Sequence, residues 1–484
     1  MPHHLITAPQ ELDPALVAAV AAGDGVRLGP ALLAGVQRQC DAAREVLRRG
    51  EPVYGVNTGM GALSGVGLSE HDQRAHQRNL LLARATGGPP WLDQAEARAI
   101  VAVRLRTFLS GDSGVSAGLC LRLAELLDQG IVPAVPRAGV GCAGEIIPLA
   151  HAFGPVTGAG RVLGPSGAVP ADGALRERGL AEFDLGPREG HALLAGVPGA
   201  TALGVLRLAD ARALAAAMER AAALSVAAAG ASRDPYAAAC ARGDEVMAGV
   251  LARLRGRAGD LAEPRALQAP VSFRVAGPVL AHVVRATDAL GAAIGRALAG
   301  VTDSPAFLDG RFAGTAGFHG IDLAAACDGL TAAIAHAAEV SAARLHRLLD
   351  PRVTGLPAQL AARPGPDAGL VAVHKRAAGE VHALRRLAAA TPVGLIETSG
   401  GQEDVQSFAW EAAEALRGAL RHARAVTACE LLAGYQACSL AGAPAPPGCR
   451  PVLARLAEIV GAIDADRPFG EDIERIIGTD LAPG

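Results

Sequence analysis

Cys142 lies in a short glycine-rich segment and is the side chain of this sequence best suited to nucleophilic chemistry. The segment reads Gly-Val-Gly-Cys-Ala-Gly over residues 139–144, and Pro148 stands near the front of the apolar run that follows. This pattern predicts that residues 142–144 lie close to the amino terminus of a helix. Free amide groups and the helix dipole at such a place stabilise anions and lower the pKa of a thiol. Cys142 is therefore a candidate nucleophile, and the alternative is a buried structural cysteine.

Tyr54 is the candidate for proton transfer. It is one of only three tyrosines in 484 residues, and it opens the sequence Tyr-Gly-Val-Asn-Thr-Gly-Met-Gly over residues 54–61. The three glycines of this segment would let a loop bend and close over a ligand. We expect Tyr54 to act as a general base, and the alternative is a structural turn that happens to carry a tyrosine.

The order of these segments resembles that of the aromatic amino-acid ammonia-lyases and aminomutases, with the histidine ammonia-lyases among them. In that family an Ala-Ser-Gly tripeptide cyclises into methylidene-imidazolone (MIO), an electrophile whose exocyclic carbon is the dehydrated serine side chain. The matching tripeptide here is Cys142-Ala143-Gly144. Alanine has no hydroxyl to lose, so Ala143 cannot supply that carbon by the family's route. The resemblance covers nearly the whole chain, and its main departure lies at the reactive centre.

The resemblance also implies substrate-binding residues. Arg84 stands in a segment, residues 78–87, where histidine-type and tyrosine-type lyases place a histidine that selects the substrate side chain. A fixed positive charge there would suit an anionic or carbonyl-bearing group, and the alternative is a solvent-facing arginine. Arg274 matches the family arginine that grips the substrate carboxylate. The other substrate-binding residues that the family's motifs imply are Gln268, Phe318, Gln402 and Glu403.

Several family residues that serve the imidazolone are absent from the matching positions. Ala195 replaces an asparagine, Val271 replaces the second catalytic tyrosine and Val405 replaces a histidine. Tyr54 and Arg274, which would act on the substrate, are retained. These changes share a direction, which indicates a divergence of the reaction.

We therefore expect an MIO-independent enzyme in which Cys142 performs acyl transfer, condensation or cyclisation of an amino-acid-derived ester or thioester in specialised metabolism. This hypothesis includes no cofactor and no metal ion. Two alternatives stay open. One is a conventional aromatic amino-acid or histidine ammonia-lyase or aminomutase, and the other is a catalytically inactive homologue that binds a ligand.

Composition and periodicity predict a mainly α-helical protein. Hydrophobic residues make up 50% of the chain and aromatic residues 3%, and apolar residues recur at helical spacing over 200–229 and 323–349. Glycine and proline interrupt the first 190 residues more often. We expect an ammonia-lyase-like fold with a loop-rich amino-terminal region over residues 1–195, which carries the active-site loop and the tripeptide. A long central helical bundle with carboxy-terminal helices should follow over residues 196–484.

Charge and cysteine usage limit the partners of the chain. With 45 basic and 48 acidic residues the formal net charge is -3, which argues against nucleic acid and against a polybasic membrane patch. The eight cysteines show neither a CxxC pair nor zinc-ligand spacing, and the amino terminus lacks a signal-peptide pattern, so we expect a cytoplasmic protein. We expect a small-molecule substrate, free or bound to a carrier protein. The resemblance implies a homotetramer whose sites combine residues from three subunits.

Overall fold

The computed structural model describes residues 2–139, 143–261, 263–394, 396–442 and 444–479. The chain forms two compact units, each made of three sequence segments. Unit 1 comprises Met1–Leu206, Leu290–Cys327 and Ala390–Glu414. Unit 2 comprises Arg207–Ala289, Asp328–Ala389 and Ala415–Gly484.

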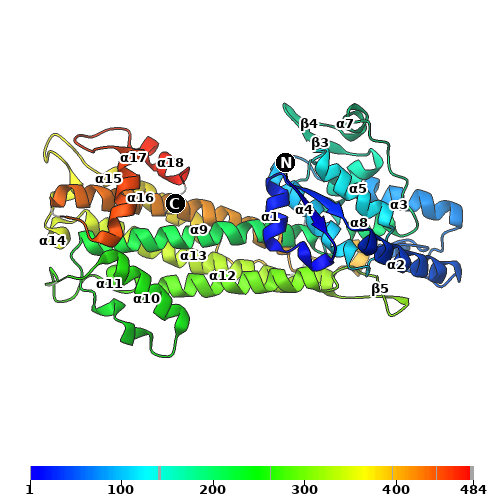
Figure 1. The fold of residues 1–484 in the computed structure, drawn as a ribbon, viewed down its shortest axis with the longest axis horizontal. Coiled ribbons are helices and arrows are strands. Elements are labelled where there is room, and N and C mark those ends of the chain that lie inside the picture. Colours follow the sequence, from blue (N-terminus) through cyan, green and yellow to red (C-terminus); the bar gives the residue numbers. More distant parts are fainter. Residues whose placement is uncertain (1, 140–142, 262, 395, 443, 480–484) are drawn as a thin grey trace. The chain divides into compact units, whose positions relative to one another are not determined.

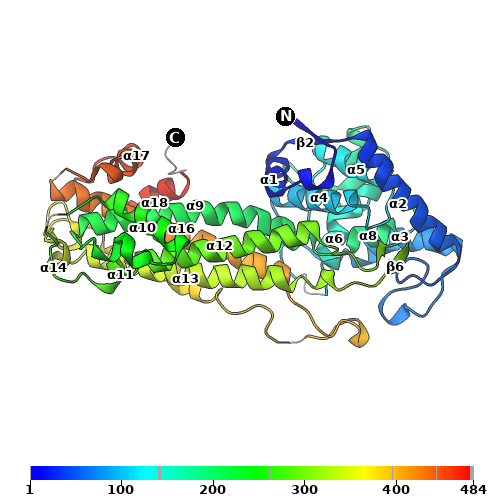
Figure 2. The same cartoon turned by 60° about the horizontal axis from the view of Figure 1, so that its bottom comes forward.

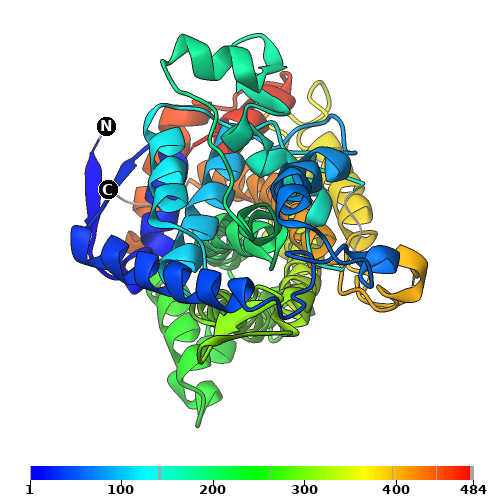
Figure 3. The same cartoon turned by 90° about the vertical axis from the view of Figure 1, so that its right-hand side faces the viewer.

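Unit 1 combines short helices with three two-stranded sheets (Figures 1 and 3). Strands β1 and β2 pair in parallel, whereas β3 with β4 and β5 with β6 form antiparallel hairpins. The strands are β1 (His3–Ile6), β2 (Gly25–Leu28), β3 (Arg161–Gly164), β4 (Gly167–Pro170), β5 (Ala306–Leu308) and β6 (Arg311–Ala313). The helices are α1 (Pro14–Ala22), α2 (Pro30–Arg48), α3 (Glu70–Arg84), α4 (Gln94–Leu109), α5 (Ala117–Asp128), α6 (Ile146–Phe153), α7 (Ala171–Glu177) and α8 (Glu189–Leu194).

Helix α4 is the buried centre of unit 1. Its amino terminus is fixed by a capping box, in which Asp93 accepts the amide of Glu96 and Glu96 accepts the amide of Asp93. Almost every residue of α4 is buried, including its three arginines. The guanidinium of Arg98, for example, donates to three backbone carbonyls at 2.8–2.9 Å. A helix held so firmly can position polar groups at a nearby site.

Unit 2 is built on long helices that run side by side (Figures 1 and 2). The long helices are α9 (Pro198–Ala228), α12 (Ala276–Ala299), α13 (Ile321–Leu348) and α16 (Ala409–Ala441), and each has residues in both units. The shorter helices are α10 (Glu245–Ala258), α11 (Val271–Arg274), α14 (Pro351–Thr354), α15 (Val371–Arg385), α17 (Arg450–Val460) and α18 (Phe469–Ile477). The prediction of a mainly α-helical chain with long helices in its second part is confirmed.

Two helical stretches, Glu189–Ala228 and Gly317–Leu348, are long and apolar enough to cross a membrane by length and composition alone. The most apolar window of the first stretch is 89% buried inside the protein, and that of the second is 56% buried. Burial of this kind is typical of core helices. Cytoplasmic location remains a prediction.

Candidate active site

A cavity of about 1140 Å³ lies within unit 1. Its volume suits a ligand of amino-acid size or larger. Segments far apart in the sequence build its wall, and Figure 3 shows two of them next to each other, the loop after Tyr54 in blue and the segment around residue 400 in orange. The lining residues fall within 52–60, 143–146, 191–197, 293–323 and 402–405.

The loop that carries Tyr54 is anchored from α3. Ser69 caps this helix by accepting the amide of Asp72, and the fully buried Gln77 on the helix donates from its Nε2 to the carbonyl of Gly55 at 3.3 Å. Tyr54 lines the cavity, and its hydroxyl accepts a hydrogen bond from the amide of Gly61 at 2.9 Å. The loop therefore presents the phenol oxygen in a defined place.

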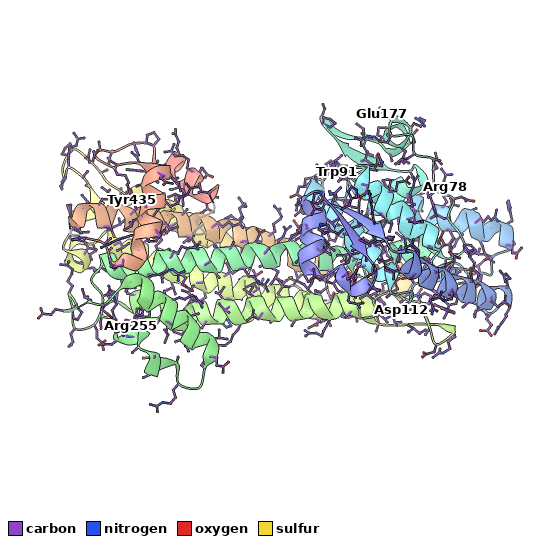
Figure 4. The ribbon with its side chains drawn as sticks, in the orientation of Figure 1. Arg78, Trp91, Asp112, Glu177, Arg255 and Tyr435 are labelled. Carbon is purple, nitrogen blue, oxygen red and sulfur yellow. The ribbon has the colours of Figure 1, made fainter. Side chains whose placement is uncertain are left out.

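Tyr54 is the tyrosine at this cavity, since the other two belong to unit 2. The hydroxyl of Tyr236 donates to the carbonyl of Phe273. That of Tyr435, which is labelled in Figure 4, donates to the carbonyl of Gly461 at 3.0 Å. Each of these two hydroxyls already has a structural role.

His191 lines the cavity beside Tyr54. The two rings meet edge to face, with centroids 6.3 Å apart and an interplanar angle of 88°. Burial and the charge of Arg188 lower the pKa of His191 to about 3, so the imidazole is neutral at physiological pH. The amide of His191 donates to Oε1 of Gln77 at 2.9 Å, so the same glutamine holds both the histidine and the Tyr54 loop. The sequence predicted a position at the reactive group for Ala195, four residues further on, but no role for His191.

Ala143 and Gly144 line the cavity directly before α6, which confirms that this part of the tripeptide lies next to a helix amino terminus. The following residue, Glu145, is buried and accepts the amides of Gly199 and Ala200 at 2.5 and 2.6 Å. These are free amides of the first turn of α9, so the carboxylate caps that helix from a distant part of the sequence. Burial raises the pKa of Glu145 to about 7, against the effect of the two amides.

A buried ion pair supports the wall of the cavity at residues 195–196. Arg104 on α4 pairs with Asp303 at 2.8 Å, and both side chains are inaccessible to solvent. Arg104 also donates to the carbonyl of Ala195, and Ser113 donates to Asp303 at 2.6 Å. Arginine charges and these hydrogen bonds lower the pKa of Asp303 although burial opposes them. Ala195, which replaces the family asparagine, is thus held through its backbone.

Phe318, Gln402 and Glu403 also line the cavity, as the sequence predicted for substrate-binding residues. The carboxylate of Glu403 accepts the hydroxyl of Thr398 at 2.8 Å and keeps capacity for a ligand. Arg84 ends α3 and is half-buried, with NH2 3.6 Å from Sδ of Met60, so it is not a fully solvent-facing arginine.

Four predicted site residues are not among the residues that line the described cavity, and Arg84 on α3 is one of them. Arg274 and Gln268 belong to unit 2, where Nε of Arg274 donates to the carbonyl of Ala269 at 3.0 Å. Cys142 lies outside the described residues.

The chain belongs to the aromatic amino acid lyase family, whose model matches residues 12–460. A histidine ammonia-lyase of Anaeromyxobacter dehalogenans is 34% identical over 483 residues, which is 95% of each chain. One of Streptomyces griseus is 34% identical over 446 residues, or 89% of this chain and 86% of the relative.

Solved structures agree on the fold. A tyrosine aminomutase of Streptomyces globisporus superposes with a TM-score of 0.91 at 26% identity and covers 99% of this chain and 96% of its own. An ergothionase of Treponema denticola has a TM-score of 0.92 at 23% identity, with 98% of both chains covered. The predicted ammonia-lyase-like fold is confirmed.

The predicted reaction is wrong. An acyl-transfer, condensation or cyclisation enzyme with a Cys142 nucleophile is contradicted by the relatives, which are named histidine ammonia-lyases and match over nearly the whole chain. The hypothesis relied on the electrostatic field expected at one thiol. The relatives favour the alternative of a conventional ammonia-lyase, which is a C–N lyase.

The prediction of an enzyme without a cofactor is also contradicted, because the family to which the chain belongs is one whose members carry MIO. Ala143 and Gly144 lie at the cavity, where the tripeptide of the family would be cyclised. The side chain of Ala143 is nevertheless a methyl group, which offers no hydroxyl for dehydration. Ala143 and Gly144 therefore do not fit MIO formed by the family's route. The chemistry of this chain has to come from its other side chains.

Proposed function

We propose that this chain is a C–N lyase that releases ammonia from an α-amino acid. The observation that carries the proposal is the similarity to histidine ammonia-lyases over 95% of the chain, combined with a cavity that brings Tyr54 and Glu403 together. Tyr54 offers a base and Glu403 a negative charge for the ammonium group of the substrate.

The elimination balances with these groups. The phenol oxygen of Tyr54, in its ionised form, takes a proton from the carbon next to the one that bears the amino group. The electron pair of that C–H bond forms the carbon–carbon double bond, and the ammonium group leaves as ammonia with the electron pair of the broken C–N bond. Arg84 lies close enough for its charge to interact with those of Tyr54 and Glu403. The Met60–Gly61 turn, whose amide donates to the phenol oxygen, keeps that oxygen in place.

We also propose that the active assembly is a homotetramer and that the carboxylate of the substrate is bound by Arg274 of another copy. Arg274 is retained from the family motif but does not line the cavity of its own chain. Co-expression of Tyr54→Phe chains with Arg274→Ala chains tests this arrangement. Mixed assemblies should regain activity that neither variant has alone, and a failure to do so would contradict a shared site.

The test of the proposed function is ammonia release from L-histidine, L-tyrosine, L-phenylalanine and 4-carboxy-L-phenylalanine. We expect ammonia and an equal amount of the unsaturated acid, which chromatography distinguishes from a rearranged amino acid. Tyr54→Phe is the inactive control. Ala143→Ser, which restores the family residue, shows whether the scaffold supports the reaction. Release by this variant, but not by the parent chain from any of the four, would exclude the proposed function.

A further inference from the structure

His191 is a buried polar side chain of the cavity that the proposed elimination leaves unused. It is 3% exposed, and neither ring nitrogen has a hydrogen-bond partner among the described residues. A buried donor or acceptor without a partner costs on the order of 1–3 kcal/mol, so native proteins rarely retain one without a use. A group that binds in the cavity would satisfy it.

The ring of His191 is held in one orientation before any ligand binds. A Cβ atom at Gly55 would lie 2.5 Å from Cδ2 and 3.0 Å from Nε2 of the histidine, so the glycine backbone packs directly against the ring edge. On the other side of the residue, its amide is bound to Gln77. A ring fixed in this way offers a hydrogen bond at little entropic cost.

The surroundings of His191 determine what it can bind. Arg188, Arg84 and His76 all oppose its protonation, and Asp303 alone among the nearby charges favours it. Burial acts in the same direction as the arginines, so the imidazole stays neutral and has one N–H donor. Since the field of the arginines is positive, a ligand atom at this place is stabilised when it carries partial or full negative charge.

We propose that His191 is a specificity-determining residue of the cavity and donates a hydrogen bond to an acceptor atom at the far end of the substrate side chain. The substrate class is then amino acids whose side chain ends in an acceptor, such as a carboxylate, carbonyl or phenol oxygen or a ring nitrogen, rather than in hydrocarbon. This inference rests on the proposed function for the amino-acid part of the ligand. The recognition of the far end rests on His191 and the charges around it, and not on the proposed reaction.

Calorimetric binding tests the inference without turnover, in chains that carry Tyr54→Phe. The ligands are L-phenylalanine, L-tyrosine and 4-carboxy-L-phenylalanine, which share one ring and end in no acceptor, a neutral oxygen and an anionic group. With His191 present we expect the carboxylated ligand to bind about 10- to 100-fold more tightly than phenylalanine, and tyrosine to lie between them. His191→Leu should reduce this ratio to about 1, and His191→Asn, which keeps a donor, should restore part of it.

Leu194→Ala is the matched control, because Leu194 also lines the cavity but has no polar atom in its side chain. It should weaken all three ligands by a similar factor. An unchanged ratio in His191→Leu, a preference for phenylalanine in the parent, or no measurable binding of any ligand would overturn the inference. If the ratio behaves as expected while no amino acid releases ammonia, the proposed reaction fails and the role of His191 stands.

Discussion

A buried network in unit 2 and the buried groups around the cavity of unit 1 differ in how fully their polar atoms are hydrogen-bonded. In unit 2 the fully buried carboxylate of Glu430 accepts both Nε and NH2 of Arg344, at 2.6 and 2.9 Å. Its oxygens also accept the hydroxyls of Ser225 and Ser341. Three helices thereby share one saturated network, since these residues come from α9, α13 and α16.

Around the cavity of unit 1 the buried groups are only partly satisfied. Nδ1 of His191, Nε of Arg104 and NH1 of Arg188 are buried without a partner among the described residues. Saturated networks rigidify a core, whereas open ones remain where a ligand completes them. The contrast indicates that the Glu430 network serves stability and that unit 1 gives up stability at its cavity for binding.

Substitution of Tyr54 by phenylalanine should give the largest effect on activity. Loss of a general base lowers kcat on the order of 10²- to 10⁴-fold. The fold should lose no more than about 1 kcal/mol, the net worth of the hydrogen bond from Gly61. Steady-state rates and urea unfolding measure the two effects. Near-normal kcat in this variant would rule out Tyr54 as the base.

Arg344→Ala should instead affect stability in unit 2. It leaves the carboxylate of Glu430 buried and unpaired, which costs about 3–5 kcal/mol of unfolding free energy. The matched control is Arg455→Ala, which breaks an exposed pair with Glu458 and should cost less than about 1 kcal/mol. Urea unfolding compares the two variants. Equal losses would show that the Glu430 network contributes no more than a surface pair.

The sequence was sufficient for the family, the mainly helical fold and the position of several cavity residues, because these depend on motifs and on hydrophobic periodicity. Tyr54, Phe318, Gln402 and Glu403 were found in this way, and all four line the cavity. The reaction was predicted wrongly because the substituted tripeptide and the changes at Ala195, Val271 and Val405 outweighed the similarity over the rest of the chain.

The supporting residues could not be read from the sequence. His191 and Glu145 interact with residues more than 50 positions away, namely Gln77 and the amides of Gly199 and Ala200. No local pattern announces such contacts, because they depend on how the elements pack. For His191 the available signal was its position four residues before Ala195, which matches a family asparagine.

Glu145 should make stability depend on pH in a direction opposite to that of most carboxylates. Its pKa is raised to about 7 from an ordinary 4.5, so the folded chain holds this proton more tightly than the unfolded chain does. The corresponding stabilisation is present below about pH 4.5 and is lost as the pH rises through 7; a shift of this size corresponds to about 3 kcal/mol. Glu145→Gln removes the titrating group. The unfolding free energy of this variant should therefore fall less than that of the parent as the pH rises from about 4.5 through 7.

Urea unfolding at several pH values between about 4.5 and 8 measures this difference. Glu458→Gln serves as the control for the exchange of a carboxylate for an amide, because Glu458 is exposed. A profile for Glu145→Gln that is identical to that of the parent would show that Glu145 does not titrate in this window.

The smallest expected effects come from a matched pair of glycine substitutions, one in each unit. Gly196, in the cavity wall, has a φ of +75°, and a Cβ there would lie 2.6 Å from Oγ1 of Thr302 and 3.0 Å from Oδ1 of Asp303. Gly196→Ala therefore adds backbone strain and a clash beside a buried ion pair, which should cost about 1–3 kcal/mol and weaken ligand binding.

Gly379 lies on the exposed side of α15 in unit 2, and a Cβ there meets no atom within 4 Å. Gly379→Ala should raise the unfolding free energy by about 0.5–1 kcal/mol, since alanine loses less conformational entropy in a helix. Ligand binding should not change. If the two substitutions instead shifted stability in the same direction, backbone conformation would not distinguish the cavity wall from the helical unit. Opposite signs would locate the strain at the site and show that ordinary helix propensity describes α15.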